Sequence, residues 1–312
     1  MTISIRSKAI LLFIGLALAP LILTTWIIIR PTVLAAIQQA RIQNLEGIGD
    51  RQAELITVWM HERLHDAAVT AAMLSMHPSE LTDQFNHTKL LYYLDTVRKE
   101  YGYKTIFVCD KDGRIWLSSG GDLKGQDVSG SDYFQQALKG STFITEVRPS
   151  EFPIENELGE KEPGVPTLLV STPVKAKGEV AGVLVLRVDL MLLNKEVRRV
   201  KMGKTGETYL VNSDGYMLTE SAFIPAIKAM GLIKKRSALE LRLKDPQTGK
   251  LTKGVKHCLE GGSGFNPEGY ADYRGVQVLG YWHWMPEFRW GLMSEIDVVE
   301  AYEVIYRLDH YL

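Results

Sequence analysis

The chain has 312 residues, of which 36 are Lys or Arg and 37 are Asp or Glu, so its formal net charge is −1. This balance excludes a basic nucleic-acid-binding tail and a disordered acidic segment, and we expect no nucleic-acid partner. With 46% hydrophobic residues and only two cysteines, the chain predicts a conventional folded core, not a disulfide scaffold. Cys109 and Cys258 belong to no Cys/His metal spacing, so we expect two unpaired thiols.

An uncharged apolar segment occupies residues 9–29. Its length of about 21 residues is sufficient to cross a bilayer as a helix, and the Pro20 within it is tolerated in lipid. Arg6 and Lys8 precede the segment, which favours an orientation with the rest of the chain outside the cytoplasm. A cleaved signal peptide is the alternative, because small residues follow at 33–36, although the apolar core is longer than usual. We predict a cytoplasmic tip and a transmembrane helix in residues 1–30.

Residues 31–100 are predicted to be mostly helical. Apolar residues recur at helical spacing from 31 to 76, which predicts one long stalk helix. A second helix is predicted over residues 88–100, and His77-Pro78 marks the turn between the two helices.

The remainder of the chain predicts two β-rich modules of similar design. Strand-like runs at 105–109 and 208–212 each lead into an Asp-Gly turn of the kind found in hairpins, and each unit closes on an apolar strand. The turns and closing strands lie at 112–113, 214–215, 182–188 and 291–297. Because both units are rich in hairpins, we predict antiparallel sheets and an α+β fold. The predicted domains are residues 101–200, residues 201–296 and a C-terminal helix at 297–312.

Several short motifs in these modules resemble the double Cache (tandem PAS-like) sensor domains of bacterial transmembrane receptors. The motifs are Phe107-Val-Cys-Asp-Lys-Asp-Gly113, Asp132-Tyr-Phe-Gln-Gln-Ala-Leu-Lys-Gly140, Gly182-Val-Leu, Gly203-Lys-Thr-Gly-Glu-Thr-Tyr-Leu-Val211 and Trp290-Gly-Leu-Met-Ser-Glu-Ile-Asp297. The resemblance extends over residues 59–302. The family includes the sensor domains of histidine kinases, chemotaxis receptors and cyclic-di-GMP enzymes.

The resemblance implies a sensor anchored in the bacterial inner membrane, with its sensor region outside the cytoplasm. Module 101–200 is then the membrane-distal one, which in the family holds a small molecule between its sheet and the helix and loops that cover it. Module 201–296 is membrane-proximal and transmits the signal to helix 297–312, which leads towards a second span. We also expect a parallel homodimer through the stalk, where small residues allow close approach. These residues are Ala67, Ala68, Ala71 and Ala72.

No output module is visible in residues 1–312. Two interpretations follow from the resemblance. The chain is part of a receptor, for which a histidine kinase output is favoured over a chemotaxis or cyclic-di-GMP output, or it is an anchored ligand-binding protein without output. In both cases we expect no catalytic module and no cofactor in residues 1–312.

In the family members that bind amino acids, an Arg two positions before an aromatic pair takes the ligand carboxylate, and an Asp on the last distal strand takes its amine. Here Ser131 stands at the first place and Arg187 at the second. The resemblance therefore disfavours a plain α-amino acid. A guanidinium at position 187 favours a small anion, because its forked donors match a carboxylate or phosphate. The candidate ligand-binding residues are Trp116, Ser131, Tyr133, Phe134, Glu146 and Arg187.

Structural interpretations of these residues stay open. In one interpretation, Arg187 forms an ion pair with Glu146 or another acidic residue, or faces solvent. In the other, Tyr133 and Phe134 are ordinary core residues. Four aromatic residues of the proximal module are candidates for lining a second pocket. A place in the core is favoured for them, because Tyr and Trp have high β propensity. These residues are Tyr209, Tyr270, Tyr281 and Trp282.

One motif points to a different class of protein. His61-Glu-Arg-Leu-His65 matches the H-E-x-x-H pattern of zinc peptidases, in which two histidines one turn apart hold Zn²⁺ and the Glu acts as general base. A third protein ligand is needed, for which Glu80 or His77 are the nearest candidates. The resemblance places the motif in the stalk helix, where a solvated or dimer-facing surface is the simpler interpretation. We therefore expect no bound metal. The alternative is a zinc site formed by His61 and His65.

Overall fold

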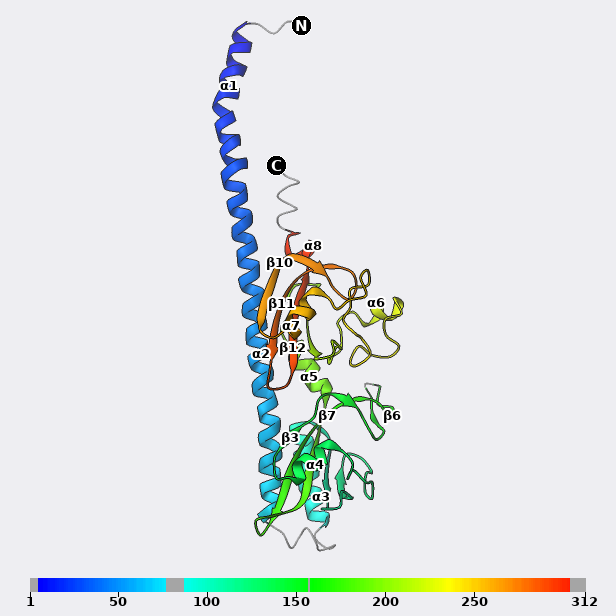
Figure 1. Cartoon of the computed structure of the whole chain (residues 1–312). Helices are drawn as coiled ribbons and strands as arrows, with labels where there is room; N and C mark the ends of the chain where they lie inside the picture. Colours follow the sequence, from blue (N-terminus) through cyan, green and yellow to red (C-terminus); the bar gives the residue numbers. More distant parts are fainter. Residues whose placement is uncertain (1–4, 77–86, 157, 304–312) are drawn as a thin grey trace.

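One long helix runs along the whole molecule (Figure 1). The computed structural model describes residues 5–76, 87–156 and 158–303. Helix α1 (Ile5–Thr24), a π-helical turn (Thr25–Ile29) and α2 (Arg30–Met76) follow one another without a break. Within the described residues, Phe13–Met76 is the helix that is long and apolar enough to cross a membrane. The predicted turn at His77-Pro78 lies outside the described residues.

The distal module is built on an antiparallel sheet. We use this name for residues 87–188. The sheet has the strand order β2-β1-β8-β7-β3, and β4 also pairs with β7. Its strands are β1 (Tyr103–Cys109), β2 (Ile115–Ser119), β3 (Phe143–Ile144), β4 (Arg148–Pro149), β7 (Pro166–Ala176) and β8 (Glu179–Val188). Helices α2 and α3 (His87–Tyr101) cover one face, and α4 (Asp132–Leu138) covers the other (Figure 1).

Strand alternation decides which side chains face α4. Leu184 and Leu186 of β8 belong to the apolar cluster that packs on α2 and α3. Val185 lies in the separate cluster that contains the α4 residues Tyr133 and Phe134. Because side chains alternate between the two faces of a strand, Arg187 points to the same face as Val185. The sequence thus places a guanidinium among the apolar residues beneath α4.

A small hairpin and a short helix connect the distal module to the next one. The hairpin consists of β5 (Ile154–Glu155) and β6 (Lys161–Glu162). The carboxylate of Glu162 forms ion pairs with Lys235 and Arg236 of the second module. Helix α5 (Leu190–Val197) follows β8, and the Val197 carbonyl accepts a hydrogen bond of 2.9 Å from Gln52 Nε2 of α2.

The proximal module contains a second antiparallel sheet, with the order β10-β11-β12-β9. We use this name for residues 207–301. Its elements are β9 (Glu207–Asn212), α6 (Ile224–Ala229), α7 (Lys253–Leu259), β10 (Ser263–Ala271), β11 (Gln277–Met285), β12 (Trp290–Asp297) and α8 (Val298–Ala301). Leu279 and Tyr281 pack with Leu45 of α2, while Met293 packs with Val255 of α7. The stalk and α7 therefore cover opposite faces of this sheet. The predicted C-terminal helix is described only as far as residue 303.

The observed fold confirms the predicted α+β class: a long apolar N-terminal helix followed by two PAS-like modules with antiparallel sheets. The predicted Asp-Gly turns are present, and Gly113 and Gly215 have φ angles of +87° and +80°, which glycine adopts without strain. The return segment after Gly215 is not a full strand, because Met217 forms only an isolated bridge with Val211. Both cysteines are free and buried, as expected.

The stalk helix has two different sides. Ile56, Met60, Ala67 and Ala71 are buried against the modules of the same chain. Ala67 and Ala71 are therefore not available for the close helix approach that the sequence predicted. The opposite side exposes several apolar residues. These residues are Leu55, Val58, Val69, Ala72 and Met76.

A pair of leucines in α3 tests the packing of the distal module. Leu94 is fully buried and Leu91 is 39% exposed. Leu94→Ala is expected to lower the free energy of unfolding by about 3 kcal/mol, because it leaves a cavity under the sheet, and Leu91→Ala by less than about 1 kcal/mol. Urea unfolding followed by circular dichroism measures both. Equal effects of the two substitutions would contradict the observed packing of α3.

Candidate functional site

A cavity of about 350 Å³ lies on the α4 face of the distal sheet. Thr105 of β1 and Arg187 of β8 contribute to it from adjacent strands, where they pair directly. The loop after β2 and the segment leading into the β5–β6 hairpin provide the other walls. The lining residues are Lys104, Thr105, Gly120, Gly121, Asp122, Leu123, Gln126, Phe152, Pro153, Ile154, Glu155, Lys161 and Arg187.

Arg187 is the most unusual of these residues. It is only 2% exposed, and its Nε and Nη1 atoms have no hydrogen-bond partner among the described residues. Burial lowers the pKa of this guanidinium, while the nearby Tyr133 and Glu151 act in the opposite direction. A buried charged group without hydrogen-bond acceptors destabilises a fold. The side chain therefore lacks the acceptors that a bound ligand would supply.

Helix α4 places an aromatic and an acidic group beside Arg187. Tyr133 and Phe134 lie in the first turn of α4 and are each 1% exposed. The Tyr133 hydroxyl donates a hydrogen bond of 3.1 Å to Glu151 Oε2, and the Ser131 hydroxyl donates one of 3.3 Å to Glu151 Oε1. Burial raises the pKa of Tyr133, so its hydroxyl stays protonated and remains a donor. A carboxylate is thus held beside the guanidinium without pairing with it.

An ion pair fixes the start of α4. Arg148 of β4 donates from Nη1 and Nη2 to the two carboxylate oxygens of Asp132, over 2.8 and 2.5 Å. These hydrogen bonds hold the pKa of Asp132 below its ordinary value. The pair is partly exposed, so it adds little stability, but its two-point geometry orients the helix that carries Tyr133.

Two of the predicted site residues lie elsewhere. Trp116 packs on the face covered by α2 and α3, with its ring 5.1 Å from that of His87. It does so because the register between β1 and β2 shifts at this point. Glu146 pairs with Arg289 of the proximal module, Oε1 to Nη1 over 3.4 Å, and therefore does not neutralise Arg187. Both residues are corrections to the predicted site. Of the six predicted residues, Arg187 alone is among those that line the cavity. Ser131 and Tyr133 bond to Glu151 beside it, and Phe134 packs in the apolar cluster beneath α4.

Several parts of the site were not predicted from the sequence, among them the loop after β2, Thr105, Glu151 and the segment 152–155. Thr105 is a polar residue inside a buried β-strand, and this pattern is a detectable signal. Glu151 and the segment 152–155 belong to an irregular stretch without periodicity. Their position over Arg187 results from the chain path between β4 and β7, which no local pattern encodes.

The H-E-x-x-H motif does not form a metal site in the described residues. His61 Nε2 lies 2.7 Å from Glu287 Oε1 of the β11–β12 loop, and its ring packs against Phe288. His65 is exposed on the stalk. Among the described residues, no group of three His, Cys, Asp or Glu side chains is arranged to hold a metal ion. The proposed third ligands, His77 and Glu80, lie outside the described residues. The peptidase alternative is not supported.

The four aromatic residues of the proximal module belong to its core. Tyr209 and Tyr270 are buried and donate hydrogen bonds to Glu295. The Tyr281 hydroxyl bonds to Asp50 of the stalk, and Trp282 stacks on His257 with ring centroids 5.7 Å apart. These side chains pack against other elements of the protein, and none of them lines the distal cavity.

Comparison with known proteins identifies the family. The model of the Cache domain (dCache_1) matches residues 34–305, and the chain therefore belongs to the double Cache family. Domains of this family are extracytoplasmic ligand-sensing domains of membrane receptors, and the N-terminal helix of this chain is long enough for a membrane span. A search of curated proteins found no match by sequence.

Solved structures with the same fold come from chemoreceptors and from a histidine kinase. The ligand-binding domain of the Campylobacter jejuni chemoreceptor Tlp3, in complex with 4-methylisoleucine, is 13% identical with a TM-score of 0.62, over 87% of this chain and 96% of that one. The Pseudomonas aeruginosa PAO1 amino acid chemoreceptor PctB, with L-Arg, is 17% identical with a TM-score of 0.56, covering 84% and 97%. The sensor domain of the V. cholerae histidine kinase DctB is 12% identical with a TM-score of 0.54, covering 83% and 98%.

The energetic role of Arg187 is testable without a ligand. Arg187→Met is expected to raise the free energy of unfolding of the dialysed protein by about 1 to 3 kcal/mol, because it removes a buried charge that lacks acceptors. Arg236→Met is the matched control. It should lower stability, because Arg236 is also buried but pairs with Glu162. Thermal unfolding compares the two, and a stability loss in Arg187→Met would indicate that the charge is already compensated.

Proposed function

We propose that the distal cavity binds a small molecule through a carboxylate or a similar oxyanion held by Arg187. The observation that carries this proposal is the pair of unpartnered nitrogens on a 2% exposed guanidinium that lines the cavity. A guanidinium presents its donors in a planar fork that matches the oxygens of a carboxylate or phosphate. A ligand of this kind replaces the missing acceptors, so its binding energy includes the relief of the unpaired charge.

The other walls indicate the size and character of the ligand. A volume of about 350 Å³ accommodates a small organic molecule. Leu123, Phe152 and Ile154 provide apolar surface for its body. We therefore infer a small organic acid in preference to a bare inorganic anion.

The charges of the site are arranged opposite to those expected for the amino-acid-binding members. A cation stands at 187, where an Asp is expected, and the carboxylate of Glu151 bonds to Ser131, where an Arg is expected. The Tlp3 and PctB structures hold amino acids. An amino acid in this cavity would therefore bind in the reverse direction, with its carboxylate on Arg187 and its ammonium towards Glu151.

We further propose that the protein is a homodimer anchored in the bacterial inner membrane. The exposed apolar residues of α2 form two groups, 55–58 and 69–76, and the exposed Glu62 and His65 lie between them. Within each group the intervals are three or four residues, which is the spacing of a helix-pairing seam. A second copy of the chain, anchored by the same helix, would present the same seam in parallel. Ligand binding would then bias two arrangements of the pair. A histidine kinase or chemotaxis output would read this shift, and an anchored binding protein without output is the alternative.

Ligand binding is tested on the full chain in detergent by thermal shift and calorimetry. The probes are acetate, propionate, lactate, succinate, L-isoleucine, L-arginine, putrescine and adenine. A carboxylate present at 100 times its Kd should stabilise the fold by about 2.7 kcal/mol. Arg187→Met should abolish this shift, whereas Lys139→Met, an exposed cation after α4, should retain it. A response to putrescine or adenine alone, or a carboxylate response that survives Arg187→Met, would refute the anionic-ligand proposal.

Dimerisation is tested separately by light scattering of the full chain in detergent. The wild-type protein is expected to have the mass of two chains at tens of micromolar. The double variant Val58→Glu, Val69→Glu introduces charge into the seam and should give single chains. Val299→Glu, at a residue that is 71% exposed on α8, is the control and should remain dimeric. A wild-type monomer would exclude the proposed dimer.

A further inference from the structure

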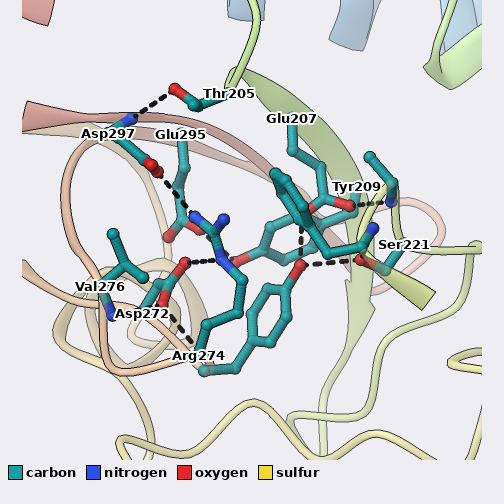
Figure 2. Close-up of polar contacts among 12 residues, drawn as sticks. Thr205, Glu207, Tyr209, Ser221, Asp272, Arg274, Val276, Glu295 and Asp297 are labelled. Carbon is teal, nitrogen blue, oxygen red and sulfur yellow. Dashed lines mark hydrogen bonds and ion pairs between the residues drawn. The ribbon is translucent and has the colours of Figure 1, made fainter. Parts of the chain in front are cut away.

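The proximal module contains a cluster of acidic groups (Figure 2). It lies on the sheet face that carries Tyr209 and Met293 and is covered by α7. Glu207 of β9, Asp272 after β10 and Glu295 of β12 are 6%, 1% and 3% exposed. Asp297 at the end of β12 joins them at the edge of the cluster (Figure 2). Three carboxyl groups removed from water in one place require either cations or protons.

Arg274 is the cation that pairs directly with this cluster in the described part of the chain. Its Nε donates to Asp272 Oδ2 and its Nη2 to Asp297 Oδ1, each over 2.7 Å. The guanidinium also lies 3.9 Å above the ring of Phe223. Arg274 therefore neutralises the two aspartates, and neither Glu207 nor Glu295 forms an ion pair with it.

The two glutamates have hydroxyl partners instead. Tyr270 donates to Glu295 Oε1 over 2.6 Å, and Tyr209 donates to Glu295 Oε2 over 3.0 Å. Tyr273 donates to Glu207, whose Oε1 also accepts from the Ala222 N–H over 2.5 Å. Burial and the charge of Asp272 raise the pKa of Glu295 to about 8, and burial also raises the pKa of Glu207.

The tyrosine and cysteine side chains around Glu295 do not titrate in the same range. Burial raises the pKa values of Tyr209, Tyr270 and Tyr273 well above the ordinary value of 10. On α7, which covers the cluster, burial raises the pKa of the Cys258 thiol to about 12. Arg274 stays charged, whereas burial raises the pKa of Asp272 in spite of its ion pair with Arg274. Burial thus raises the pKa values of three carboxyl groups of the cluster, Glu295, Glu207 and Asp272, and that of Glu295 lies at about 8.

The cluster lies directly beside the segment that leaves the module. Glu295 precedes Asp297 by two residues on β12, and α8 begins at the next residue. The Asp297 N–H donates to Thr205 Oγ1 over 3.3 Å, and Glu300 of α8 accepts from the N–H groups of Lys204 and Thr205 over 2.7 Å. Two residues, Ile296 and Asp297, thus separate Glu295 from α8, which lies at the end of the module that faces α1 (Figure 1).

We propose that the proximal module is a proton-binding sensor element. Glu295 and its neighbour Glu207 hold a proton in one state and release it in another. This release displaces β12 and α8. Deprotonation adds a negative charge to a buried group that already faces two aspartates and one arginine. The charge is relieved when the strand moves or water enters. The domain thus responds to pH at a site separate from the distal cavity, and this inference does not depend on the proposed ligand.

The direction of the pH dependence follows from the raised pKa. The folded-state pKa of about 8 lies above the ordinary value of 4.5 that applies to the unfolded chain. The stabilisation by the bound proton is therefore complete below pH 4.5, decreases as pH rises, and is lost once pH exceeds about 8. Wild-type protein should lose stability relative to Glu295→Gln over this range, because glutamine carries no charge. Its amide oxygen accepts from one tyrosine hydroxyl, and its NH2 group donates to the oxygen of the other.

Infrared difference spectroscopy of the full chain in detergent tests the protonation directly. A carboxylic-acid band should be present at neutral pH and disappear on alkaline titration. Glu295→Gln should lose a component of this band, and Glu268→Gln should not, because Glu268 is an exposed residue of the same sheet. Tyr270→Phe removes a hydrogen bond that favours the ionised carboxylate, so it should move the midpoint to higher pH. This second variant keeps the test valid if Glu295→Gln does not fold.

Amide hydrogen exchange tests the coupling to the output segment. After correction for the intrinsic exchange rate at each pH, protection of β12 and α8 in the wild type should fall about tenfold between about pH 7 and pH 9. Glu295→Gln should show constant protection, and Glu268→Gln should behave as wild type. Absence of a carboxylic-acid band at neutral pH, or the same loss of protection in Glu295→Gln, would overturn the proposal.

Discussion

The packing of two separate sheets on one side of a single helix is the constraint on which this structure depends. Helix α2 has 47 residues, so it extends for about 70 Å. A continuous apolar cluster joins Ile56 and Met60 of this helix to Leu186 in the distal sheet and to Leu292 in the proximal sheet. Because both sheets give one face to the stalk, their polar sites lie on the opposite faces. The helix that fixes the modules is also continuous with the predicted membrane segment.

Each of the two polar sites contains a buried ionisable group, and the two sites differ in how its charge is compensated. Arg187 is a buried cation whose Nε and Nη1 lack acceptors, so its charge is compensated when an anion enters the cavity. Glu295 is a buried acid with hydroxyl donors and, in the described part of the chain, no paired cation, so its charge is avoided by binding a proton. In both cases the unfavourable burial of a charge is retained at a place where a small ligand or a proton relieves it. Such groups are expected where a sensor must distinguish two states.

Much of the fold and part of the site are predictable from local patterns. The apolar spacing of α2, the Asp-Gly turns and the alternation of β8 depend on neighbouring residues, and the period of two places Arg187 on the α4 face. Trp116, a predicted site residue, lies on the opposite face from Arg187, because a shift of register in the β1–β2 pair changes the direction of its side chain. Glu146 and Glu151 are both acidic residues in irregular segments, and sequence alone does not distinguish the one that lies beside Arg187.

The sequence by itself determined the long apolar N-terminal helix, the stalk, the two antiparallel modules and the presence of a guanidinium on the last distal strand. Each of these depends on periodicity or composition within a short stretch. Only the tertiary structure decided what surrounds each charge. Glu151 lies beside Arg187, and Tyr209 and Tyr270 bond to Glu295, through contacts between residues far apart in the chain. The ionisation state of a buried group is set by these distant neighbours and by its loss of water, neither of which is a property of the local sequence.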